Sequence, residues 1–422
     1  MMNVSDTAAY AFLIFMVGQV LPASAVAQDQ LGHLFSDGAF SGQLRYRYEH
    51  VYQDGPPPVN HDANASTLRV NLGYKTGEYK KIRGFVEGQA IFHLGEDRFN
   101  DMVNGRTSYP TVVDPDIIEL NQSWLSWSGI SGVELKLGRQ VLNLDNQRFI
   151  GSVDWRQNDQ TFDAVIGSYS DASRRLQLQY GYIWNVNRIF GNDYPLGDLE
   201  TISHILRSSY QFSTLLNVVA YGYWLDFDRL PSSSSRTIGL RTTGKAIITE
   251  ALSLNYEAEY ALQEDFASNP LSYSEGYNHL SIAFAYKGIA AGLGREILGG
   301  NNTIAFQTPL ATLHKFNGWS DKFLATPATG LKDRYASLGY KFGEDKGLLA
   351  KTELAGVYHD FSGDSVGDYG HELNVSLSKV FEYSSSTVFK TAVVTFKYAD
   401  YTAKDAPYTD TQKVWLQLST GF

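Results

Sequence analysis

Apolar and polar side chains alternate along most of this chain, in segments of about ten residues that each end in a turn. In the early segment "QLRYRYEH", residues 43–50, one face carries Leu44, Tyr46 and Tyr48 and the other face is polar. The last segment, "KVWLQLSTGF", repeats the alternation. A period of two with one polar face is the signature of a β-strand. The chain is therefore expected to be all-β.

Counting these segments predicts about eighteen strands. They are expected near residues 40–50, 65–75, 81–93, 116–128, 131–140, 160–169, 174–186, 200–210, 215–227, 236–246, 251–263, 276–286, 288–296, 333–342, 347–360, 368–380, 387–399 and 412–422. The segments at 215–227 and 387–399 are apolar on both parities, so the pattern leaves their orientation open.

The connections between the segments alternate in length. Short turns, such as 128–131 and 287–288, alternate with long polar loops, such as 94–115 and 297–332. This alternation is typical of a transmembrane β-barrel with antiparallel strands, short periplasmic turns and long extracellular loops, and such barrels lie in the bacterial outer membrane. Closure removes the sheet edges, which lipid does not tolerate. A soluble lipocalin-like barrel is the alternative, but its eight to ten strands would use only about half of the chain.

The inward face of such a barrel is expected to be charged, because a barrel of this strand number encloses a water-filled lumen rather than a packed core. The parity places these arginines inside: Arg45, Arg47, Arg69, Arg83, Arg175, Arg207 and Arg241. Rings of arginine attract anions, and interleaved carboxylates hold the guanidinium groups in place. The alternative is that these are ordinary solvated lumen residues, paired with one another and indifferent to solute.

The first residues are typical of an export signal. Residues 8–21 form an apolar stretch too short to span a bilayer, and "AVA" at 25–27 provides small residues for cleavage. We therefore predict a signal peptide over 1–27, a short periplasmic lead over 28–39, and a single barrel domain over 40–422.

Composition narrows the function classes. The chain has no cysteine, so disulfides, thiolate metal sites and cysteine nucleophiles are excluded. The net charge of -10, with no basic run, argues against nucleic-acid binding. Neither a nucleophile elbow nor a zinc-helix motif occurs, so we expect no enzyme, metal or cofactor. Two alternatives stay open: an outer-membrane barrel enzyme of the lipase or protease kind, and an adhesin that binds calcium near residues 363–372.

The most informative stretch is "LGRQVLNLDNQRFIGSVDWRQNDQTFDA", residues 137–164, which joins two predicted strands through a long loop. Its polar groups are dense, and Phe149 and Trp155 are candidates to anchor it inside the barrel as a constriction. Strict parity puts Arg139 on the lipid face; either a bulge at Gly138 turns it inward or it lies above the hydrocarbon layer. Arg295, in the similar "LGREILGG", has the same parity.

At these residues the chain resembles the alginate-export outer-membrane porins. The resemblance rests on the Gly-Arg-Gln opening at 138–140, on "DNQRFIG" and "WRQNDQTFDA", and on "FLATPATGLKDRYASLGYKF" at 323–342. It implies a monomeric porin whose arginine-rich constriction passes an anionic polysaccharide, oligosaccharide or other small anionic solute. By motif position the constriction residues would be Arg139, Arg148, Asp154, Arg156 and Asp163.

The final strand also resembles the signal by which outer-membrane assembly machinery recognises bacterial barrels, because it is amphipathic and ends in Phe422.

Overall fold

The computed structural model describes residues 32–55, 59–95, 97–364, 367–383, 389–405 and 407–422. The predicted signal peptide lies outside the described residues, as do residues 28–31 of the predicted lead. Residues 32–36 are helical and precede the first strand. The fold below concerns the described residues.

Eighteen strands occur in the described chain, which confirms the expected number. Their bounds are β1 (Ala39–Gln53), β2 (Ala63–Lys75), β3 (Ile82–His93), β4 (Ile117–Trp127), β5 (Val133–Gln140), β6 (Thr161–Ser170), β7 (Leu176–Asn187), β8 (Asp198–Ser213), β9 (Leu216–Leu225), β10 (Ser235–Ile247), β11 (Leu252–Asp265), β12 (Ser274–Tyr286), β13 (Ile289–Leu298), β14 (Leu331–Lys341), β15 (Thr352–Ser362), β16 (Asp368–Glu382), β17 (Thr391–Ala403) and β18 (Thr411–Gly421).

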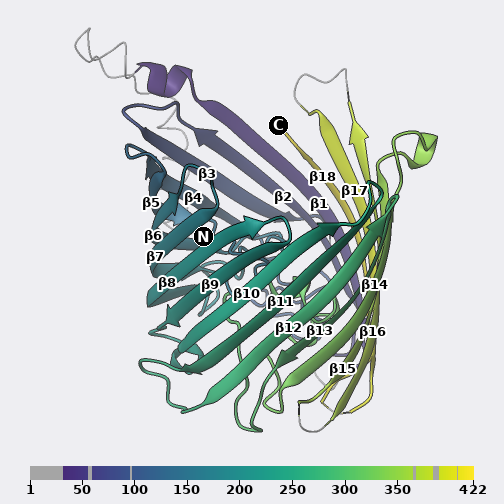
Figure 1. Ribbon diagram of the computed structural model, residues 1–422. Helices are drawn as coiled ribbons and strands as arrows, with labels where there is room; N and C mark the ends of the chain where they lie inside the picture. Colours follow the sequence, from purple (N-terminus) through teal and green to yellow (C-terminus); the bar gives the residue numbers. More distant parts are fainter. Residues whose placement is uncertain (1–31, 56–58, 96, 365–366, 384–388, 406) are drawn as a thin grey trace.

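Each strand pairs antiparallel with its neighbours in the sequence, and β1 also pairs with β18. The sheet therefore closes into a barrel (Figure 1). At the seam Gln43 lies opposite Gly421, and Gln53 lies opposite Thr411. Closure satisfies the backbone groups that an open edge would leave unpaired. The predicted fold class is confirmed.

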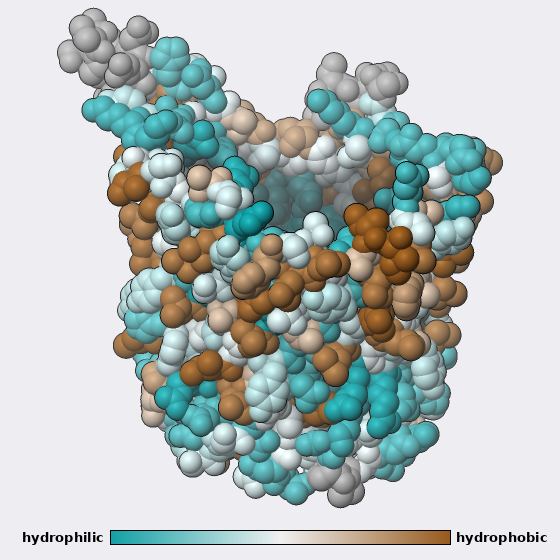
Figure 2. Space-filling model, in the orientation of Figure 1, coloured by the Kyte–Doolittle hydropathy of each residue, from teal (hydrophilic) through white to brown (hydrophobic). Residues whose placement is uncertain are grey.

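The outer wall carries the apolar parity of each strand. In β18, Leu416 and Leu418 are exposed, while Lys413 and Trp415 on the opposite parity are buried. Figure 2 shows apolar side chains gathered around the middle of the wall, polar side chains toward both ends, and a hollow with a polar surface at the upper end. A wall of exposed leucine side chains is favourable when it contacts lipid instead of water.

The helical segments are short. Three 3-10 turns are described: η1 (Pro231–Ser233), η2 (Leu313–Lys315) and η3 (Gly347–Leu349). The turn η3 occupies positions predicted to begin the fifteenth strand, so β15 starts later, at Thr352. Within the described residues, no helix is long and apolar enough to cross a membrane.

Two long loops that connect different pairs of strands contact one another. The first inner loop, residues 141–160, joins β5 to β6, and the second inner loop, residues 299–330, joins β13 to β14. They form a parallel bridge between Ile150 and Leu310. The amide of Gly151 donates to the carbonyl of Leu310 at 2.9 Å, and the amide of Thr312 donates to the carbonyl of Gln147 at 3.1 Å.

A packed apolar core lies between the two inner loops and the inward face of the wall. Phe149 contacts the rings of Tyr221, Tyr277 and Phe306 at centroid distances of 5.2, 5.5 and 6.0 Å. This corrects the expectation of a lumen that holds water instead of a core. The alternation of polar and apolar residues predicts which strand side chains face inward. It does not predict that apolar side chains of the inner loops pack against those strand side chains. The core also explains β9, because Tyr221 and Tyr223 face the loops while the other parity faces outward.

Candidate functional site

Two arginines of the barrel wall hold the first inner loop against β1 and β2. The Arg45 guanidinium donates from Nε to Gln157 Oε1 at 2.9 Å and from Nη1 to the carbonyl of Asp154 at 2.8 Å. Arg69 donates from Nη1 to Asp159 Oδ1 at 2.9 Å. Both arginine side chains are buried. Their charge and donors are used to fix the loop, so they are not open to a passing solute.

Arg156 links this loop to the wall and to the second inner loop. Its Nη1 lies 3.2 Å from Glu49 Oε2, and its Nη2 lies 3.3 Å from Asp321 Oδ2. Burial alone lowers the pKa of the Arg156 guanidinium, but Glu49, Asp114 and Asp321 together raise the pKa above its ordinary value. Arg156 therefore stays charged and holds three elements together.

Arg148 makes a second buried link. Its Nε lies 2.9 Å from Glu296 Oε1 on β13, and its Nη2 donates to Asn317 Oδ1 at 3.1 Å. Its guanidinium carbon also lies 4.7 Å from the centre of the Phe316 ring. Because Arg148 is 2% exposed, its role in this geometry is to join the two inner loops to β13.

An aromatic stack lies where both loops reach β17 and β18. Trp155 stacks on His314 at a centroid distance of 4.2 Å with the planes 4° apart. The Lys397 ammonium lies 3.8 Å from the Trp155 ring centre and 3.7 Å from that of Trp319. Lys397 Nζ donates to His314 Nε2 at 2.9 Å, and His314 Nδ1 donates to Asp321 Oδ1 at 2.8 Å. Cation–π contacts of this kind are strongest away from water.

This stack fixes the protonation of its loop residues. Burial, followed by the nearby Lys397 charge, lowers the pKa of His314 well below its ordinary value. Burial raises the pKa of Asp321, but Lys413 and His314 outweigh that effect and hold the pKa well below its ordinary value. A neutral histidine thus accepts from a lysine and donates to a carboxylate.

Two arginines on another part of the wall keep partial contact with solvent. The side chains of Arg207 on β8 and Arg241 on β10 are 16% and 13% exposed. Arg207 Nη2 lies 2.7 Å from Asp145 Oδ1 of the first inner loop, and Arg241 Nη2 lies 2.6 Å from Glu257 Oε2 of β11. Among the predicted lumen arginines these two combine inward parity, solvent access and a position opposite the loop.

Arg139 and Asp163 lie on the outer face, which corrects their assignment to the pore. Arg139 pairs with Asp163 across β5 and β6 without a register shift within β5, so it keeps the parity of exposed Leu137. Gly138 has a φ of 121° but does not turn Arg139 inward. Arg139 Nε lies 2.8 Å from Asp163 Oδ1. The pairing satisfies both charges on the outer wall.

Arg295 and Arg175 also lie outside the lumen, and for Arg175 this corrects the inward position expected from its parity. Arg295 is exposed and lies opposite Leu280 on the outer face, as its parity indicates. Arg175 precedes β7 and is exposed in a short turn. Asp154 is exposed on the first inner loop, where its backbone carbonyl accepts from Arg45.

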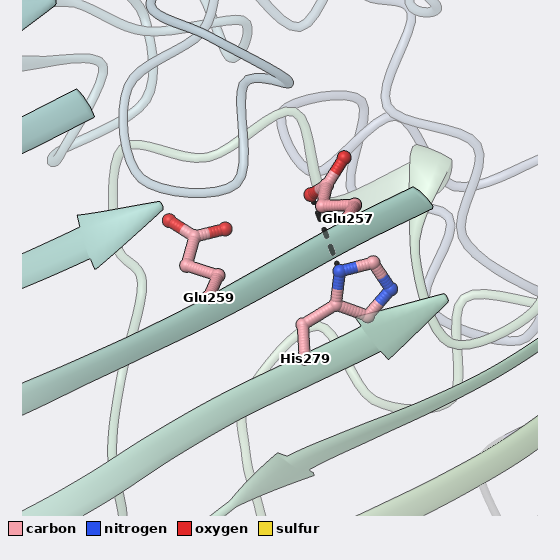
Figure 3. A group of neighbouring side chains, drawn as sticks. All are labelled: Glu257, Glu259 and His279. Carbon is pink, nitrogen blue, oxygen red and sulfur yellow. Dashed lines mark hydrogen bonds and ion pairs between the residues drawn. The ribbon is translucent and has the colours of Figure 1, made fainter. Parts of the chain in front are cut away.

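Glu257, Glu259 and His279 form a group on β11 and β12 that sequence reasoning did not single out as a site (Figure 3). Each offers a ligand atom within 4.8 Å of the others. Figure 3 shows His279 turned toward Glu257, to which its Nδ1 donates at 3.2 Å. Arg241 reaches Glu257, and its Nε lies 3.7 Å from Glu259 Oε2. That guanidinium already supplies the positive charge, so we assign no metal here.

The sequence itself matches one known family in part. Residues 37–180 match the model of a family described as "Alginate export". They include the first inner loop and all the strands from β1 to β6. The second motif of the resemblance, at 323–342, lies beyond the matched residues.

Solved structures share the whole barrel. Acinetobacter baumannii OccAB2 is 16% identical, with a TM-score of 0.72 over 93% of this chain and 99% of its own. Pseudomonas aeruginosa OccK9 (OpdG) is 15% identical, with a TM-score of 0.71 over 92% of this chain and 100% of its own. A comparison with curated proteins gives no match. The chain thus shares the barrel fold of these structures, and its apolar outer wall places it in the bacterial outer membrane.

Proposed function

We propose that this protein is an outer-membrane channel through which anionic solutes diffuse passively. The observation that carries the proposal is the pair of inner loops: ion pairs hold them inside a closed barrel, against charged side chains of its wall. A constriction of charged side chains selects solutes by charge and size.

The preference for anions is supported by positive groups that keep some contact with solvent. Arg207 and Arg241 line the wall opposite the first inner loop. On the second inner loop, Lys322 is half-buried and lies near Lys413; burial and the Lys413 charge lower the pKa of Lys322 to about 8. Lys322 therefore stays mostly protonated at neutral pH and adds positive charge beside the loop.

The substrate class we propose is a carboxylated saccharide or a similar small anion, because the family description concerns alginate export. The buried arginines have a different role in this proposal. Arg45, Arg69, Arg148 and Arg156 shape the constriction, and the solute passes groups that are less deeply buried. One chain closes the barrel by itself, so we also propose that the functional unit is a monomer.

Conductance in planar lipid bilayers tests the proposal. Purified protein inserted into a bilayer between unequal potassium chloride solutions should give ion currents and a reversal potential of the sign set by chloride. A sodium glucuronate gradient then asks whether a carboxylated sugar carries current. A reversal potential of the sign set by potassium would exclude anion preference, and the absence of any conductance would exclude a channel.

A further inference from the structure

Asp145, at the wall end of the first inner loop, occupies the space in front of two arginines. Its Oδ1 lies 2.7 Å from Arg207 Nη2, and both of its carboxylate oxygens lie 3.1 Å from Arg207 Nε. Its Oδ1 is also 3.9 Å from Arg241 Nη1. This arrangement is the two-point pairing by which a guanidinium recognises a carboxylate.

The loop is shaped to present that carboxylate. Asp145 has a φ of 51°, a left-handed conformation that aspartate tolerates better than most residues. The next residue, Asn146, donates from Nδ2 to Glu257 Oε1 at 3.1 Å. Two successive side chains thus fix the loop to the wall, and Asp145 is the one that brings a negative charge.

The two arginines differ in their other partners. Arg241 contacts Glu257 at 2.6 Å and Glu259 at 3.7 Å on the neighbouring strand, so it stays neutralised by the wall. Within the described chain, the ion pair recorded for Arg207 is the one with Asp145. Removing the Asp145 charge would therefore leave the Arg207 guanidinium uncompensated, in a position that is 16% exposed.

We propose that Asp145 is the specificity-determining residue of the channel: it is a built-in counter-anion that competes with the carboxylate of a solute for Arg207. While Asp145 is bound, it lowers the positive potential at this point and weakens anion preference. A solute carboxylate that takes its place makes the same paired hydrogen bonds with Arg207 and frees the loop carboxylate. This inference rests on the proposed function and adds the residue that limits its selectivity.

The test compares Asp145→Asn with a matched control on the same loop. Asp154→Asn makes the same change of charge at an exposed position outside the Arg207 pair. We expect Asp145→Asn to raise the chloride-to-potassium permeability ratio, measured from reversal potentials, at least about twofold, with a much smaller change in Asp154→Asn. Asp145→Glu, which keeps the charge, should stay near the wild-type ratio.

The outcomes separate this inference from the proposed function. A wild-type protein that inserts but never conducts would defeat the channel itself. A wild-type channel whose permeability ratio is the same in Asp145→Asn, or rises equally in Asp154→Asn, would overturn the role of Asp145 alone. Folding is checked by the shift in gel mobility on heating, which reports a closed barrel in each variant.

Discussion

Burial decides what each charged residue can do in this protein. Arg47 and Arg148 are among the largest fully buried or nearly buried side chains, at 1% and 2% exposed. Removing one partner of a buried ion pair costs about 3–5 kcal/mol, because the other charge stays buried without compensation. Such buried arginines hold the inner loops and the wall in place and do not contact a passing solute. Selectivity is therefore expected from residues such as Arg207, which solvent still reaches.

His314 makes the loop assembly sensitive to acid. Its pKa in the folded protein lies well below the ordinary 6.5, so it stays neutral there, whereas the unfolded chain takes up a proton below pH 6.5. Stability is therefore fully present above pH 6.5 and falls as the pH drops, by about 1.4 kcal/mol for each pH unit. Urea unfolding followed by tryptophan fluorescence should show this loss between pH 7.5 and 5.5.

The comparison for this prediction is His314→Gln. Glutamine has no proton to gain, so the change in stability between the two pH values should be smaller in the variant than in wild type. Trp155 and Trp319 lie beside His314 and report the assembly directly. An equal loss in both proteins would mean that other groups cause the acid sensitivity.

At the scale of elements, strands were predictable and loop positions were not. Alternation has a local cause, since each strand faces lipid on one side and the lumen on the other, and it located β1 and β18 to within a few residues. The pairing of Arg148 with Glu296 joins residues far apart in the sequence, and no local pattern encodes it. Parity was sufficient for Arg139, whose outward position follows from its register with Asp163.

Gly138 is the residue on which the β4–β5 pairing is expected to depend. Its φ of 121° suits glycine, and a Cβ there would lie 2.3 Å from the carbonyl oxygen of Ser123. Gly138→Val should therefore destabilise the folded barrel by at least about 1–3 kcal/mol. The temperature at which gel mobility changes should fall.

Gly356→Ala provides the control for this substitution. Its Cβ would meet the carbonyl oxygen of Asn374 at 3.6 Å, an ordinary contact distance, so the transition temperature should change little. If Gly138→Val were as stable as Gly356→Ala, the strained backbone at position 138 would not matter to the barrel.

At the scale of the whole molecule, the protein has two parts: a wall held by backbone pairing between strands, and an interior that is attached to the wall mainly by side chains. Phe149 belongs to the interior core and contacts four of its aromatic rings. Phe149→Ala should cost the interior about 3–5 kcal/mol and leave the backbone pairing of the wall intact. The heat-dependent shift in gel mobility should then persist, while protease cleavage within residues 141–160 becomes faster.

Leu348→Ala serves as the matched truncation, because Leu348 is 90% exposed in η3. It should leave both the gel shift and the cleavage rate unchanged. A Phe149→Ala protein that resisted protease as wild type does would show that the loops do not depend on the apolar core.

The tethers between loop and wall have a consequence for how such a pore can diversify. The first inner loop is formed by residues 141–160, but the arginines that bind it, Arg45 and Arg69, lie on β1 and β2. A loop grafted from a relative would lack the strand residues that bind it. It would not be held against the wall unless those strands were transferred as well. New selectivity therefore has to be inherited as a set of loop and strands together.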